Sequence, residues 1–325
     1  MKEFENDIQA ADALKEVFAT LQREIGKVII GQEDVIKLLL TSIFCQGHCL
    51  LVGVPGLAKT LLIHTIADAL DLKFNRIQFT PDLMPSDILG AETLDKERNL
   101  QFIKGPVFAN IILADEINRT PPKTQAALLE SMQEYAVTIG GKKYDLEKPF
   151  FVLATQNPIE QEGTYPLPEA QLDRFMFNVQ LDYPTYDQEI QIVRRTTTGI
   201  ETNVNSVLHG DEIKFFQQIV RKVPVTDNVV EFAVKLVHKT RPNTTEASPL
   251  AKEYLEWGAG PRASQNLILG AKCNALLNGK YSPDIEDVKA VVIPTLYHRL
   301  VRNFKAEAEG IQVETIIDEL FNQSL

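Results

Sequence analysis

The chain has 325 residues, enough for two domains with a sizeable hydrophobic core. Its formal net charge of −11 argues against a protein built mainly to bind nucleic acid, and its three cysteines give no disulfide framework and fit a reducing compartment. No apolar run is long enough to span a bilayer and the N-terminus is charged rather than signal-like, so we expect a cytoplasmic protein.

The first part of the chain predicts two helices. Apolar residues at helical spacing predict one helix over residues 3–25, and a second helix ends near Ile43. Between them the apolar run 28–30 leads into Gly31 and Gln32. A glycine beside an apolar run suits contact with an adenine ring, but it equally suits a simple turn between helices. The sequence leaves both interpretations open, and we carry Gly31 and Gln32 forward as nucleotide-binding candidates.

Potential metal ligands cluster just after the second predicted helix. Cys45, His48 and Cys49 have the side chains of a metal site, but they stand at the entry to an apolar strand and no fourth ligand is nearby in sequence. We therefore expect buried structural residues rather than a metal centre.

A glycine-bearing loop joins a predicted strand at 49–52 to a predicted helix at 61–70. It reads Gly53-Val54-Pro55-Gly56-Leu57-Ala58-Lys59-Thr60, followed by Leu61. Backbone N–H groups of such a loop cradle phosphates at the positive end of the following helix. Lys59 is placed to reach the β- and γ-phosphates of a nucleotide, and the Thr60 hydroxyl to ligate Mg²⁺. The alternative is an ordinary strand-to-helix turn with a surface lysine.

Ala58 departs from the usual pattern of this loop, which has glycine at that position. Alanine adds one methyl group near the phosphates. We expect the methyl group to be tolerated if Ala58 has helical dihedral angles.

Four more short apolar strands are predicted, at residues 74–79, 110–114, 150–154 and 175–179. Apolar strands alternating with crossovers predict an α/β fold with a five-stranded parallel sheet covered on both faces. Ligands bind at the carboxyl ends of such strands, so the residues that follow each strand belong together.

Polar side chains follow these strands. Asp115 and Glu116 follow the third, where they cap the next helix or, functionally, hold Mg²⁺ and polarise an attacking water. Asn157 follows the fourth, where its amide bonds its own turn or holds that water or the γ-phosphate. Arg174 stands just before the fifth, as a salt bridge at the rim or as a cation aimed at a phosphate.

Two segments of the chain are additional to the elements of a minimal nucleotide-binding sheet. Residues 80–108 contain a helix start at Pro85 and a hairpin around 96–99, and residues 135–147 contain a hairpin with Gly140-Gly141 as its turn. They are surface decorations or, as we prefer, elements that face a partner or a pore.

The pattern changes after residue 183, where helical periodicity replaces strands. We place the domain boundary there, with an α/β core over 1–183 and an all-helical domain over 184–325. Predicted helices cover 186–198, 211–221, 226–239, 262–278, 284–293 and 313–322. With Pro261 as first helical residue, Arg262 falls in the first turn, where the helix dipole disfavours a cation unless an anion approaches. The alternative is an arginine reaching into solvent.

Four motifs together resemble the MoxR family of AAA+ ATPases, and the resemblance runs over nearly the whole chain. They are the loop at 53–60, Leu-Ala-Asp-Glu-Ile-Asn-Arg at 113–119, Ala-Thr-Gln-Asn-Pro at 154–158, and Leu-Pro-Glu-Ala-Gln-Leu-Asp-Arg-Phe at 167–175. Ala58 is the family's own form of the loop. Val52 departs from the family, which usually has an acidic residue there, but it lies outside the phosphate contacts.

The resemblance implies a role for each candidate residue. Lys59 and Thr60 would be Walker A, and Asp115 and Glu116 would be Walker B. Asn157 would be sensor 1, and Arg262 a sensor 2 that reads the γ-phosphate in cis. Arg174 would be an arginine finger that acts on the nucleotide of the neighbouring subunit; independently of the resemblance, Arg119 is the next candidate if Arg174 does not act in this way. The two extra segments resemble the helix 2 insert and the pre-sensor hairpin of the AAA+ branch that includes MoxR proteins. The all-helical part resembles the AAA+ lid.

The resemblance also implies ATP and Mg²⁺ as cofactors, a ring that is typically a hexamer, and a chaperone-like role on client proteins, often ones with von Willebrand factor A domains. Two other classes remain as alternatives. A nucleic-acid motor shares the helix 2 insert but is disfavoured by the acidic balance. A non-hydrolysing, nucleotide-dependent scaffold is disfavoured by the intact Glu116.

Overall fold

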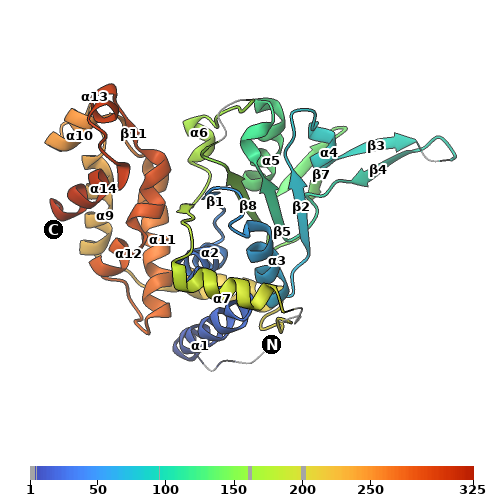
Figure 1. The fold of residues 1–325 in the computed structure, drawn as a ribbon, viewed down its shortest axis with the longest axis horizontal. Coiled ribbons are helices and arrows are strands. Elements are labelled where there is room, and N and C mark those ends of the chain that lie inside the picture. Colours follow the sequence, from blue (N-terminus) through green and yellow to red (C-terminus); the bar gives the residue numbers. More distant parts are fainter. Residues whose placement is uncertain (1–3, 5, 95, 160–162, 199–202) are drawn as a thin grey trace.

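The computed structural model describes residues 4, 6–94, 96–159, 163–198 and 203–325. At its centre lies a five-stranded parallel sheet in the order β2-β5-β8-β1-β9 (Figure 1). The strands are β1 (Cys49–Val52), β2 (Phe74–Gln78), β5 (Ile111–Asp115), β8 (Phe151–Gln156) and β9 (Phe177–Gln180). The predicted five-stranded parallel sheet is confirmed.

The sheet is covered on both faces because successive side chains of a strand point in opposite directions. Leu51, Leu113 and Leu153 join one hydrophobic cluster with the helices α1 (Asp7–Gly26), α2 (Glu33–Phe44) and α3 (Lys59–Ala69). Leu50, Ile112 and Val152 join the other cluster with α5 (Pro122–Glu134). Burial on both faces explains why the strands are continuous apolar runs in the sequence.

Two hairpins are added to this core, as predicted. After α4 (Pro85–Leu89), β3 (Gly90–Leu94) and β4 (Leu100–Lys104) form an arm that extends away from the sheet (Figure 1). The second hairpin pairs β6 (Ala136–Ile139) with β7 (Lys142–Asp145). Its turn has φ of +56° at Gly140 and +77° at Gly141, the left-handed pair that a tight two-residue turn requires.

The two hairpins pack on each other through aromatic rings. Phe102 of β4 stacks on Tyr144 of β7 with 4.2 Å between ring centroids, and its edge meets the ring of Phe108. Stacked rings contribute about 0.5–1.5 kcal/mol beyond their buried area. The second hairpin is therefore attached to the middle of the arm.

The second half of the chain is mainly helical. Its helices are α7 (Tyr186–Thr196), α8 (Gly210–Lys222), α9 (Asp227–Lys239), α10 (Pro249–Tyr254), α11 (Pro261–Leu277), α12 (Ile285–Leu296), α13 (Phe304–Ala308) and α14 (Val313–Asn322). A short antiparallel pair, β10 (Leu255–Trp257) with β11 (Val301–Arg302), was not predicted. Among the described residues no helix has the length and apolar character needed to cross a membrane. The boundary at residue 183 stays a prediction.

Candidate functional site

The glycine-bearing loop turns the chain from β1 into α3 with two left-handed residues. Gly56 has φ of +89°, which glycine adopts freely. Ala58, at the N-cap of α3, has φ of +53° and ψ of +28°. Ala58 therefore does not meet the condition of right-handed helical dihedral angles under which we expected its methyl group to be tolerated, because the chain makes its turn into the helix at this residue. The left-handed conformation costs a residue with a Cβ about 1–2 kcal/mol.

Lys59 opens α3 and folds back over the loop. Its Nζ donates to the carbonyl oxygens of Gly53 at 2.5 Å and Val54 at 3.2 Å. The ammonium group is thus held at the loop by neutral acceptors, which phosphate oxygens would replace with stronger, charge-assisted bonds.

One cavity brings the predicted residues of three strand ends together. Residues 55–61 of the loop line it with Asp115 and Glu116 from the end of β5 and Asn157 from the end of β8. The expectation that the residues following the strands meet at one edge of the sheet is therefore confirmed for this set. Thr60 and Asp115, the two predicted metal ligands, both face this cavity.

Asp115 is 8% exposed, and both of its carboxylate oxygens are engaged. Oδ1 accepts the Thr155 hydroxyl at 2.6 Å. Oδ2 accepts Nε and Nη2 of Arg76 on β2, at 3.0 and 2.7 Å. Arg76 was not among the predicted site residues. The sequence marks Arg76 only by its place on a predicted strand, and that strand, β2, lies adjacent to β5 in the structure.

Glu116 is held by two side chains. Its Oε2 accepts Nε2 of Gln78 and Nη1 of Arg119, each at 3.0 Å. Gln78 also accepts Nη2 of Arg76 at 2.5 Å, so Arg76 and Gln78 connect the two adjacent carboxylates. Glu116 itself has φ of +57°, and its N–H donates to the Thr155 hydroxyl oxygen at 2.8 Å. Arg119, the second finger candidate, bonds within its own subunit here.

The side-chain amide of Asn157 both bonds its own turn and faces the cavity, so the structure agrees with both interpretations of this residue. Its Oδ1 accepts the N–H of Ile159 at 3.1 Å, so it bonds its own turn. It also lines the cavity, and its amide nitrogen makes no hydrogen bond to any residue that the structure describes. A donor therefore remains for a group in the cavity.

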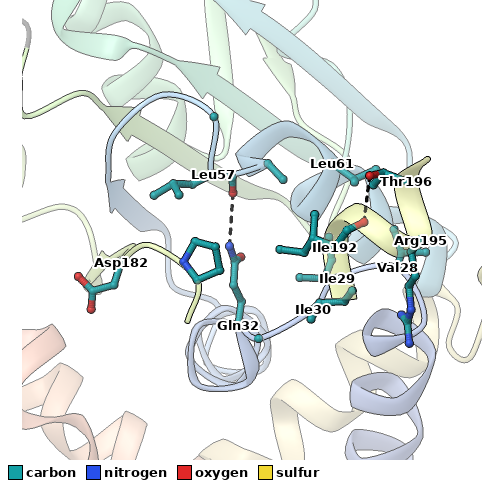
Figure 2. A pocket seen from close by; sticks show the side chains of 14 residues that line it. Val28, Ile29, Ile30, Gln32, Leu57, Leu61, Asp182, Ile192, Arg195 and Thr196 are labelled. Carbon is teal, nitrogen blue, oxygen red and sulfur yellow. Dashed lines mark hydrogen bonds between the residues drawn. The ribbon is translucent and has the colours of Figure 1, made fainter. Parts of the chain in front are cut away.

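A second, mostly apolar cavity adjoins the loop (Figure 2). It is lined by residues 28–32, the loop residues 56–58, Leu61, and Ile192 and Thr196 of α7. Arg195 ties α7 to the end of α1 by donating from Nη1 to the Lys27 carbonyl at 2.8 Å. Gly31 and Gln32 thus lie next to the loop and not merely in a turn between helices.

Gln32 has an unsatisfied acceptor in this cavity. Its Nε2 donates to the Leu57 carbonyl at 3.3 Å, which fixes the amide orientation because a carbonyl can only accept (Figure 2). Its Oε1 is buried and has no partner among the described residues. Buried polar atoms are normally satisfied, so this oxygen indicates a missing donor.

Gly31 is required by its surroundings. Its φ is +73°, and a Cβ built there would lie 2.3 Å from the amide carbon of Gln188 on α7. A side chain at this position would be strained by the positive φ and would force the Gln188 side chain to move.

Arg174 and Arg262 lie apart from both cavities. Arg262 is in the first turn of α11, as predicted, and its Nη1 is 3.5 Å from Oδ2 of Asp173. Arg174 follows Asp173, is half-buried, and its guanidinium makes no bond within the described part of the chain. The structure therefore brings Arg262 beside the segment that carries Arg174, and it does not bring either to the loop.

Cys45, His48 and Cys49 are buried, as expected. Burial lowers the pKa of His48 to about 4 and raises that of the Cys49 thiol to about 12. His48 accepts the Val152 N–H at 3.0 Å through Nδ1. Within the described ranges no group of three or more His, Cys, Asp and Glu side chains could hold a metal ion.

Comparison with known proteins gives two family matches. Residues 48–177 match the ATPase family associated with various cellular activities (AAA), and residues 247–320 match the AAA lid domain. The protein YeaC of Bacillus subtilis is 40% identical over 301 residues, covering 92% of this chain and 91% of YeaC. The chaperone MoxR1 of Mycobacterium tuberculosis is 40% identical over 315 residues, covering 95% of this chain and 83% of MoxR1.

A solved structure is similar over the same extent. The crystal structure of a proposed ATPase from Cytophaga hutchinsonii superposes with a TM-score of 0.90 at 42% identity, covering 97% of this chain and 96% of that one. Core and helical part are therefore both shared with this relative.

Proposed function

Because the chain belongs to the MoxR family of AAA+ ATPases, we propose that it binds Mg·ATP at the loop cavity and hydrolyses it. The observation that carries this proposal is the meeting of the loop, Asp115, Glu116 and Asn157 around one cavity, with an apolar cavity beside it. The loop cavity suits a triphosphate, and the apolar cavity suits a base. A nucleotide lying across the loop would fill both.

The phosphate end is supported by the donors around it. N–H groups of the loop and the α3 N-terminus would cradle the phosphates, and Lys59 would exchange its two carbonyl acceptors for phosphate oxygens. The Thr60 hydroxyl and the Asp115 carboxylate are oxygen groups that suit Mg²⁺. Bound Mg²⁺ would supply neutralisation of charge on the phosphates.

Glu116 and Asn157 are proposed to act on the attacking water. Glu116 would accept its proton as general base, and the amide nitrogen of Asn157 would orient the water or the γ-phosphate. In the present arrangement Gln78 and Arg119 occupy one carboxylate oxygen of Glu116. These bonds hold the carboxylate in place.

Gln32 is proposed to select adenine. The 6-amino group of adenine would donate to the unsatisfied Oε1, whereas the 6-oxo group of guanine would place two acceptors against each other. Competition of ATP and GTP for a fluorescent ATP analogue tests this. Wild type should prefer ATP, and Gln32→Ala should reduce that preference about tenfold, as expected for one hydrogen bond.

We further propose a ring, typically a hexamer, in which Arg174 completes the site of the neighbouring subunit. Arg174 lies outside both cavities, and its guanidinium bonds to no residue that the structure describes; both observations support action in trans. Arg262 was expected to read the γ-phosphate in cis, and that role requires it to leave Asp173. A chaperone-like action on client proteins is proposed from the Mycobacterium relative, which is named a chaperone. Clients with von Willebrand factor A domains are proposed only from the family resemblance given by the sequence motifs.

Two substitutions separate nucleotide binding from hydrolysis. Lys59→Ala should abolish ATP binding, because it removes the charge-assisted contact to phosphate. Glu116→Gln should keep binding and lose turnover, because an amide cannot accept the proton of water. Calorimetry with Mg·ATP and a phosphate-release assay measure the two effects. Equal ATP affinity of wild type and Lys59→Ala would refute the site, and absence of turnover in wild type would favour a scaffold.

A further inference from the structure

The segment that carries Arg174 is fixed by one buried arginine of the helical part. Arg299 ends the short 3₁₀ helix η2 (Tyr297–Arg299), and its side chain is 2% exposed. Nε donates to Oδ1 of Asp173 at 2.8 Å, and Nη2 donates to the carbonyls of Asp173 at 3.2 Å and Phe175 at 2.7 Å. Nη1 donates to the carbonyls of Met176, at 3.3 Å, and Thr295.

These contacts use every donor of the guanidinium group, which has five N–H bonds. Four of them go to the segment from Asp173 to Met176, on both sides of Arg174. His298 of the same 3₁₀ helix adds a bond from Nε2 to the Phe175 carbonyl at 3.1 Å. The backbone that carries Arg174 is thus attached to η2, whereas the Arg174 side chain itself bonds to no described residue.

Asp173 receives a second cation. Its Oδ1 is bonded to Arg299, and its Oδ2 lies 3.5 Å from Nη1 of Arg262. Burying a guanidinium group costs several kcal/mol unless its donors are satisfied, and packing alone would be served as well by an apolar side chain. The precision of this site is therefore better explained by the placement of the residue between Asp173 and Phe175 than by stability.

We propose that Arg299, acting through Asp173 and the adjoining carbonyls, is a positioning residue that aims Arg174 at the neighbouring subunit. This inference rests on the proposed function of Arg174 as a finger in trans. The orientation of the helical part of one subunit then sets how well the next subunit hydrolyses ATP. Arg299 affects the neighbour's site and leaves its own intact.

The test uses Arg299→Lys, which keeps the charge but cannot make the planar set of five bonds. Homogeneous Arg299→Lys should bind ATP like wild type and hydrolyse it about 10²-fold more slowly, the loss expected when a catalytic group is displaced by about 1 Å. Arg302→Lys is the matched control. It changes a nearby arginine of β11 that bonds to the Ile311 carbonyl, away from the Asp173–Met176 segment, and it should keep the wild-type rate.

Mixed rings distinguish positioning from a general structural defect. An Arg299→Lys subunit has an intact site of its own, so a Glu116→Gln neighbour should lend it a well-aimed Arg174 and restore ATPase activity. Arg299→Lys mixed with Arg174→Ala should stay inactive, because neither subunit presents a working finger. Subunit exchange is verified by fluorescence transfer between labelled variants, and Asp173→Asn should behave as Arg299→Lys if the latter folds poorly.

The reference mixture is Arg174→Ala with Glu116→Gln. If that mixture recovers activity while Arg299→Lys with Glu116→Gln does not, the positioning role is overturned and the finger assignment stands. If the reference mixture fails despite subunit exchange, the finger in trans is wrong, and the role of Arg299 falls with it. Recovery of Arg299→Lys by Arg174→Ala would also contradict the proposal.

Discussion

Two alanines of this chain allow the strain in the loop to be measured. Ala58 and Ala19 are both exposed, but Ala58 has left-handed dihedral angles, whereas Ala19 lies within the right-handed helix α1. Substitution by glycine removes the same methyl group and adds the same freedom to the unfolded chain in both cases. The difference between Ala58→Gly and Ala19→Gly therefore isolates the cost of the backbone conformation.

The magnitudes follow from this comparison. Ala19→Gly should lower the free energy of unfolding by about 1 kcal/mol, the helix-interior cost of glycine. In Ala58→Gly a backbone entropy cost of about 0.5–1 kcal/mol is offset by relief of about 1–2 kcal/mol of left-handed strain. Ala58→Gly should thus be about 1–2 kcal/mol more stable than Ala19→Gly, and about neutral or slightly stabilising relative to wild type.

Urea unfolding followed by circular dichroism measures both variants, and calorimetry checks that Ala58→Gly keeps its ATP affinity. A free energy of unfolding for Ala58→Gly that is no higher than that of Ala19→Gly would show that the loop stores no strain at this residue.

Three further predictions concern the residues around Asp115 and Glu116 and the buried His48. Gln78→Ala should keep ATP affinity and slow phosphate release about tenfold, because Glu116 loses a charge-assisted hydrogen bond; an unchanged rate would contradict the role of Gln78. In a Glu116→Gln background, Arg76→Ala should lower the Mg²⁺ concentration for half-maximal nucleotide binding about fivefold, because it removes a half-exposed ion pair on Asp115 worth about 1 kcal/mol. No change, or a rise, would contradict competition between Arg76 and Mg²⁺ for Asp115. His48 has a pKa of about 4 in the fold against 6.5 for an ordinary histidine, so the unfolded state binds the extra proton and stability falls as pH drops from 6.5 to 4. The free energy of unfolding should depend less steeply on pH in this range in His48→Gln than in wild type, and equal slopes would refute the assignment.

The sheet could be predicted from the sequence because its strands are buried on both faces. Ile111 to Ala114 read as one apolar run, and the carboxylates that follow must lie at the sheet's edge. The glycine-bearing loop was predictable for a similar reason, since its two glycines and Lys59 lie within seven residues of one another, at positions 53–59. The conformation of Ala58 was not, because alanine rarely adopts left-handed angles and its sequence neighbours gave no sign of them.

The missed contacts join residues that are distant in sequence. Arg76 is on the edge strand β2, where an exposed charged side chain is ordinary, and only the pairing of β2 with β5 places it at Asp115. Arg299 and Asp173 are 126 positions apart, and a buried ion pair has no local pattern. Arg262 was correctly placed in its helix, but a first-turn position does not tell which anion it meets.

The stacking of Phe102 on Tyr144 has a mechanical consequence for the arm formed by β3 and β4. Phe102 stands two residues from Leu100 along β4, a distance of about 7 Å at about 3.3 Å per residue. Rotation by about 10° about the ring stack would therefore move the far end, where exposed Leu94 and Leu100 face each other, by about 1 Å. The arm is in effect a lever with its fulcrum at the ring stack, so a small tilt of the β6–β7 hairpin is transmitted to the exposed leucines at the end of the arm.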